Sequence, residues 1–132
     1  MTYYPDLSPY TYDPTDKEML NIGWLSREHS YPTGATPDGL VYALIELAKN
    51  KTNMQRGMHF CDLCPDFETA QLHTFRGKVF IGSGEIRLTD RQGVTFSSPA
   101  MIVHYVEDHA YLPPEDYCTA VLSSTRGTPS TD

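Results

Sequence analysis

The stretch Cys61-Asp-Leu-Cys64, joined with His104-Tyr-Val-Glu-Asp-His109 after 39 intervening residues, decides how this chain is expected to fold. The combined pattern is C-x2-C…H-x4-H, two thiolates and two imidazoles at spacings that suit one tetrahedral zinc ion. Four protein ligands close such a site and leave no position for a reacting water. We therefore predict a structural, zinc-finger-like site made by Cys61, Cys64, His104 and His109.

The spacing within each half of the motif determines which backbone conformation brings its two ligands to one ion. A gap of two residues allows a tight turn to bring both sulfurs to one ion. Positions five apart on a regular helix are rotated by about 140°, so the two imidazoles converge only if the last helical turn opens. Pro113-Pro114 follows shortly after and favours such an opening. Metal binding is then expected to stabilise the fold by about 10 kcal/mol or more.

Two other histidines compete for the ligand positions. His59 precedes Cys61 by two residues, and His73 follows Cys64 by nine, so either one could replace a helical histidine. His104 could instead be a core histidine bonded to a backbone carbonyl, because its neighbours are apolar. Cys118 lies on the apolar side of the last predicted helix, where a free cysteine packs as a small hydrophobic residue.

Redox and hydrolytic chemistry are weaker interpretations of the same residues. A redox C-x2-C places its first cysteine at a helix N-terminus within a βαβ pattern, and the segment after Cys64 predicts no such helix. A hydrolytic zinc keeps three ligands, one water and a nearby general base, for which Glu107 is the candidate. If all four ligands bind, Glu107 is a solvated side chain on a polar helix face.

The first part of the chain predicts one strand and one secure helix. Leu20–Leu25 is typical of a short strand in which Trp24, the only tryptophan, is buried. Thr36-Pro37-Asp38 supplies a cap, a proline at the first helical position and an acid in the first turn. The apolar stripe that follows predicts a helix ending near Asn50.

The second part predicts a small antiparallel sheet and two more helices. Three short strands, separated by glycine-containing turns, predict an antiparallel meander over Lys78–Ile81, Glu85–Leu88 and Val94–Phe96. Ser97-Ser98 is a good cap for a helix over Pro99–Val106, and Pro114 opens a last helix. The fold class is therefore α+β, with about three helices and the zinc site joining the cysteine turn to the penultimate helix.

Length and composition indicate one domain that a bound metal ion would help to stabilise. The chain has 132 residues without an internal repeat, 10 prolines and 9 glycines, which implies many turns and short elements. We predict a single domain over 1–122, with 1–16 as an extended arm rich in tyrosine and proline. Its rings either cover the core or form an exposed aromatic surface. Residues 123–132 have the composition of a flexible tail.

The charge is acidic, at −7 from 10 Lys+Arg and 17 Asp+Glu. Nucleic-acid binding needs clustered cations, so it is disfavoured, whereas a basic protein partner suits this balance. No run approaches the length of a membrane span, and the start shows no secretion signal. We therefore expect a cytoplasmic protein.

Several stretches together resemble a family of small uncharacterised bacterial proteins. They are the C-x2-C and H-Y-x3-H motifs with Tyr4–Tyr10, Asn21–Leu25, Pro32–Gly34, Gly84–Arg87 and Tyr111-x-Pro113. The likeness runs from Tyr3 to about Leu122. It implies a compact, metal-clipped bacterial domain and brings no catalytic residue with it.

For function, these observations favour a non-enzymatic, zinc-stabilised protein-interaction module, such as an adaptor or an immunity-like protein. The alternative is a zinc-dependent hydrolase in which one ligand position is exchangeable.

Overall fold

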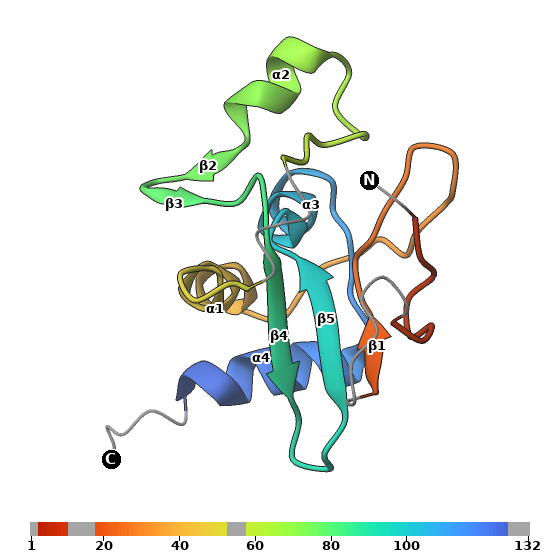
Figure 1. Ribbon diagram of the computed structural model, residues 1–132, viewed down its shortest axis with the longest axis vertical. Helices are drawn as coiled ribbons and strands as arrows, with labels where there is room; N and C mark the ends of the chain where they lie inside the picture. Colours follow the sequence, from red (N-terminus) through yellow and green to blue (C-terminus); the bar gives the residue numbers. More distant parts are fainter. Residues whose placement is uncertain (1–2, 11–17, 53–57, 127–132) are drawn as a thin grey trace.

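The computed structural model describes residues 3–10, 18–52 and 58–126, and confirms the α+β class (Figure 1). Within these ranges there are four helices, a mixed three-stranded sheet and a two-stranded hairpin. In chain order the elements are β1 (Met19–Asn21), α1 (Leu40–Ala48), α2 (Phe67–Leu72), β2 (Phe75–Arg76), β3 (Val79–Phe80), β4 (Glu85–Thr89), β5 (Thr95–Pro99), α3 (Ile102–Asp108) and α4 (Glu115–Arg126).

The sheet has the order β1-β5-β4, and β5 at its centre is buried along its whole length. β4 pairs with β5 antiparallel, as predicted, but β1 pairs with β5 in parallel. The predicted first strand of the meander, Lys78–Ile81, is not in this sheet, because β3 pairs with β2 in a separate hairpin. Turn signals between neighbouring segments indicate hairpins, whereas a parallel partner from the distant N-terminal part leaves no local signal.

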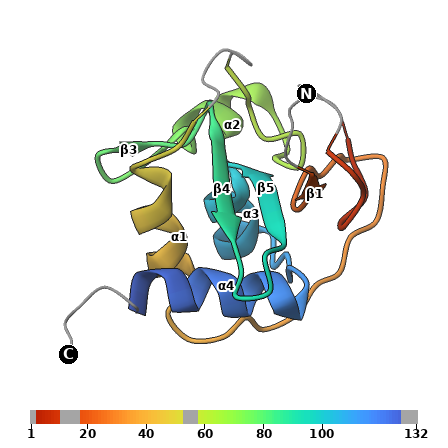
Figure 2. The same ribbon diagram turned by 60° about the horizontal axis from the view of Figure 1, so that its bottom comes forward.

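The body of the molecule is formed by the sheet and the longer helices. α1 contacts α3 and α4, and α4 also contacts β4 (Figures 1 and 2). The segment 65–81, here called the α2 lobe, lies at the opposite end of the molecule from α4 (Figure 2). Most of the largest fully buried side chains lie outside this lobe and include Trp24, Tyr105, Tyr111, Tyr117 and Phe96. Among the described residues, no helix combines the length and apolarity that crossing a membrane requires.

Helix α1 begins later than the sequence predicts. The backbone NH of Leu40 bonds to the carbonyl of Pro37 in a turn, and Gly39 then adopts a left-handed conformation with φ of 85°. A left-handed residue cannot continue a right-handed helix, so regular structure starts only at Leu40. The end at Ala48, two residues before Asn50, agrees with the prediction.

The predicted cap Ser97-Ser98 belongs to β5 instead, and α3 begins at Ile102. Both serines are fully buried, yet their polar groups are bonded within the sheet region. The carbonyl of Ser97 accepts a hydrogen bond from the indole of Trp24 at 3.0 Å. The hydroxyl of Ser98 lies 2.7 Å from that of Tyr117 in α4. Partners that are distant in the sequence thus make a strand out of a stretch that resembles a helix cap.

Two further boundaries differ from the predictions. α2 was not predicted; it is only six residues long, and the side chain of Asp66 caps it by accepting from the NH of Thr69 at 2.8 Å. α4, which was predicted, continues to Arg126 and so takes in residues 123–126 of the predicted tail. The rest of that tail, 127–132, lies outside the described residues.

The N-terminal arm packs against the body in its described part, residues 3–10. The NH of Tyr4 bonds to the carbonyl of Trp24, and the two rings meet edge to face at 5.8 Å. Farther along, Pro9 bridges to Leu20 of β1. The ring of Tyr4 therefore covers part of the core, as in the simpler of the two predicted roles. Residues 11–16 of the predicted arm lie outside the described residues.

The carboxylate of Asp6 connects this arm to the body by hydrogen bonds, and removing it is expected to destabilise the fold. One carboxylate oxygen accepts from the NH of Gly23 at 2.9 Å, and the other accepts from the hydroxyl of Tyr111 at 2.8 Å. Asp6→Ala leaves both donors without this partner, so we expect a loss of about 1–3 kcal/mol in unfolding free energy. Urea titration measures it. Asp38→Ala, at an exposed position, serves as the control, and equal stability of the two variants would contradict the assignment.

Candidate metal centre

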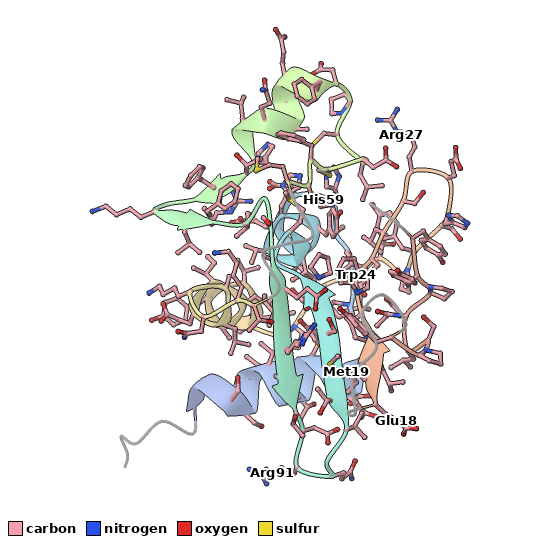
Figure 3. The ribbon with its side chains drawn as sticks, viewed as in Figure 1. Glu18, Met19, Trp24, Arg27, His59 and Arg91 are labelled. Atoms are coloured by element: carbon pink, nitrogen blue, oxygen red, sulfur yellow. The ribbon has the colours of Figure 1, made fainter. Side chains whose placement is uncertain are left out.

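The two cysteines lie on a tight turn, the knuckle (residues 61–64), that a neighbouring loop holds in place. Within the turn, the NH of Leu63 points to the sulfur of Cys61 at 3.3 Å, as in metal-binding knuckles. Arg27 donates to the carbonyls of Asp62 and Cys64 at 2.9 and 2.7 Å, and its own NH donates to the carboxylate of Asp62 (Figure 3). These bonds fix the turn before any ion is considered.

One histidine lies within α3 and the other directly after its last residue, where the helix opens as the sequence predicts. His104 is inside the helix, whereas His109 follows the last helical residue with φ of −123° and ψ of 13°. Ala110 then takes a left-handed conformation, with φ of 56°. The carbonyl of His109 accepts from the hydroxyl of Tyr31 at 3.0 Å. Leaving the helix at this point turns the second imidazole toward the first.

The four predicted ligands converge on one position. Their donor atoms all lie within 4.8 Å of one another, and both cysteines and His104 are buried. The sulfur of Cys64 lies 3.3 Å from Nε2 of His104, and the sulfur of Cys61 lies 3.4 Å from Nε2 of His109. The two Nε2 atoms are 3.2 Å apart.

These separations are close to the edges of a tetrahedral metal site. With usual zinc bond lengths, the edges of a regular tetrahedron are about 3.6 Å between sulfur and nitrogen and about 3.3 Å between two nitrogens. The sulfur of Cys64 and Nε2 of His109, at 3.7 Å, fit as well. The cluster can therefore hold a metal ion.

Burial shifts the pKa values of the histidines and of the Cys61 thiol in opposite directions. Burial lowers the pKa of His104 to about 4, although a hydrogen bond to Asp108 works against it, and burial also lowers the pKa of His109. Both imidazoles are thus neutral at pH 7 and can offer a lone pair. Burial raises the pKa of the Cys61 thiol to about 12, so a bound cation must displace its proton.

The competing histidines lie outside the group of four. His59, which Figure 3 places where the α2 lobe joins the body, is buried, and its Nε2 lies 2.8 Å from the hydroxyl of Tyr105. His73 follows α2 and stacks on the ring of His104, with centroids 4.3 Å apart. Cys118 is buried in α4, and its thiol points to the carbonyl of Pro113 at 3.7 Å.

Sequence reasoning missed the side chains that support the ligands. Asp108 lies 2.8 Å from Nδ1 of His104, at the i,i+4 spacing that places two side chains on the same helix face. That spacing could have identified it. The role of Arg27, which is 35 residues from Asp62 in the sequence, had no comparable signal.

A shallow cleft of about 360 Å³ adjoins the cysteine side of the centre. Apolar side chains of Phe60, Pro65 and Phe67 line it together with the carboxylates of Asp62 and Asp66. The rings of Phe60 and Phe67 meet edge to face at 4.9 Å. Arg27 also lines the cleft, which therefore combines an aromatic wall with two acidic groups and one cation.

Comparison with known proteins gives a family but no relative of established role. No curated protein matches the chain, and neither does any solved structure. One protein family, described as "Domain of unknown function (DUF7919)", matches residues 2–122, which include the whole cluster and nearly all described elements. The chain therefore belongs to the DUF7919 family.

Proposed function

We propose that this chain is a zinc-stabilised protein-interaction module of the bacterial cytoplasm, non-enzymatic and comparable to an adaptor or an immunity protein. The observation that carries the proposal is the convergence of four buried or half-buried protein donors at tetrahedral separations. An ion held by all four has no free position for a substrate. Its role is then to join the knuckle to the end of α3.

Zinc is the ion that this donor set favours. Two thiolates and two imidazoles in a tetrahedral arrangement are typical of structural zinc, whereas magnesium and calcium prefer oxygen ligands. The donors are also close-set and sheltered from solvent, which suits an ion that remains bound.

The surface of the α2 lobe supports a role in binding another protein. Phe67 and Leu72 of α2 are 58% and 78% exposed, and Phe75 of β2 is 53% exposed. Exposed Asp62, Asp66 and Glu68 lie in or next to the cleft beside Phe67. Apolar side chains with acidic neighbours fit a partner that presents apolar and basic residues, in agreement with the net charge of −7.

The hydrolase alternative needs one exchangeable ligand and a general base. Glu107, the candidate base, has a carboxylate oxygen 2.8 Å from the guanidinium of Arg76. It is thus engaged in an ion pair on the lobe side of α3. We therefore keep the interaction module as the proposal.

The experiment compares partner binding by the wild type and by surface variants. Partners are captured from the source cells with the tagged, metal-loaded protein, and each candidate is then purified and titrated. Phe67→Ser with Phe75→Ser is expected to weaken binding at least tenfold, because exposed aromatic anchors dominate such interfaces. Tyr42→Ser, at a residue 68% exposed on α1, is the control. A metal-bound water together with hydrolytic turnover would contradict the proposal, as would equal binding by all variants.

A further inference from the structure

The ring of His104 has two distinct sides, and only one faces the cluster. Its Nε2 lies with the two sulfurs and His109, whereas its Nδ1 lies 2.8 Å from Oδ2 of Asp108. An ionised carboxylate only accepts hydrogen bonds, so this contact places the proton on Nδ1. The lone pair is thereby left on Nε2, where a metal would bind.

Asp108 is itself held by the α2 lobe. Arg76 of β2 donates from a terminal guanidinium nitrogen to the same Oδ2 atom at 2.9 Å. His73, at the end of α2, stacks on the ring of His104 with an interplanar angle of 20°. The ring is therefore fixed by a carboxylate at its edge and by a second ring on its face.

We propose that Asp108 is a positioning residue of the metal centre, which fixes the tautomer and orientation of His104, and that Arg76 holds Asp108 in that role. The inference rests on the proposed metal centre and adds to it. Carboxylates that accept from a metal-bound histidine orient the ring and make it a better donor. The lobe thus contributes to metal affinity from outside the ligand set.

A second metal site is the competing interpretation of the same atoms. Donor atoms of His73, His104 and Asp108 also lie within 4.8 Å of one another. However, Nδ1 of His73 is 3.8 Å from Oδ2 of Asp108, while the Arg76 cation already lies 2.9 Å from that oxygen. A divalent cation there would meet the positive charge of Arg76. The hydrogen-bonded arrangement accounts for the geometry without a second ion.

The test measures the affinity of Zn²⁺ and Co²⁺ by competition with a chromophoric chelator. Asp108→Ala is expected to lower affinity about 10- to 100-fold. Asp108→Asn keeps an acceptor oxygen and should fall between this variant and the wild type. Glu107→Ala is the matched control, since Glu107 contacts Arg76 but has no contact with His104 among those described. Nitrogen NMR of the zinc-loaded wild type should show His104 protonated at Nδ1.

Each outcome has a definite meaning. If the wild type binds no metal, the proposed centre and this inference both fail. If it binds one equivalent and Asp108→Ala binds as tightly as the wild type, only the inference is overturned. His73→Phe retains the stacked ring without its nitrogens and should keep full affinity. A second equivalent of metal, lost in His73→Phe, would establish the competing site instead.

Discussion

Replacing Cys61 with serine, or His104 with alanine, is expected to abolish metal binding and the cooperative unfolding transition. Each change removes one of four donors that lie within 4.8 Å of one another, and the remaining three cannot close a tetrahedral site. Metal binding of this type is worth about 10 kcal/mol or more, comparable with the whole stability of a small domain. The expected loss is therefore of the same size as the stability that holds the fold together.

Two measurements check this result. Elemental analysis of the purified wild type should give one zinc per chain, and each variant only a small fraction of that. Thermal unfolding should change from one steep transition to a broad one. Cys118→Ser is the matched control, because Cys118 is buried but points to the carbonyl of Pro113, away from the cluster. Full zinc content in the Cys61 variant, or well below one equivalent in the wild type, would contradict the metal centre.

The second large effect is expected at a buried ion pair on the sheet. The side chain of Glu85 in β4 is completely buried and lies 2.8 Å from the guanidinium of Arg87. It also accepts from the hydroxyls of Tyr10 and Ser97, at 2.8 and 3.0 Å. The ring of Tyr10 lies over the guanidinium at 5.3 Å. The N-terminal arm and two strands thus meet at one buried carboxylate.

Arg87→Met is expected to lower the unfolding free energy by about 3–5 kcal/mol, because it leaves Glu85 buried without this cation. Adding Glu85→Gln should restore much of the loss, since the charge is then gone while the hydroxyls keep an acceptor. Urea titration of the two single variants and the double variant measures the coupling. Lys49→Met breaks only the exposed pair with Glu46 and should leave the unfolding midpoint unchanged. Additive losses in the double variant would refute the coupling.

The centre shows how much a motif can predict. The identities of the four clustered residues and the opening of α3 before His109 followed from spacing and from the prolines after it. The contact between His104 and Asp108 could also be predicted, because their i,i+4 spacing places both side chains on one helix face. In contrast, Arg27 and Arg76 reach the centre from loops or strands that are far away in the sequence, and nothing local marks them.

The helices show the same division. α1 and α4 were predicted because each has its own apolar stripe and start signal, which are properties of a few consecutive residues. α2 was missed because six residues are too few to define a helical period. Its apolar residues Phe67 and Leu72 are exposed, so they do not mark a face that packs on the core. The serines of β5 were misassigned because their partners, Trp24 and Tyr117, come from other parts of the chain.

The sequence by itself determined the α+β class, the principal helices and which four side chains gather. These follow from short-range rules of spacing, capping and periodicity. Only the tertiary structure decided that β1 lies parallel to β5, that β3 leaves the sheet for a hairpin, and that Asp6 and Glu85 anchor the arm. Such pairings depend on the free energy of packing distant segments together, and no single stretch of residues is sufficient to predict that free energy.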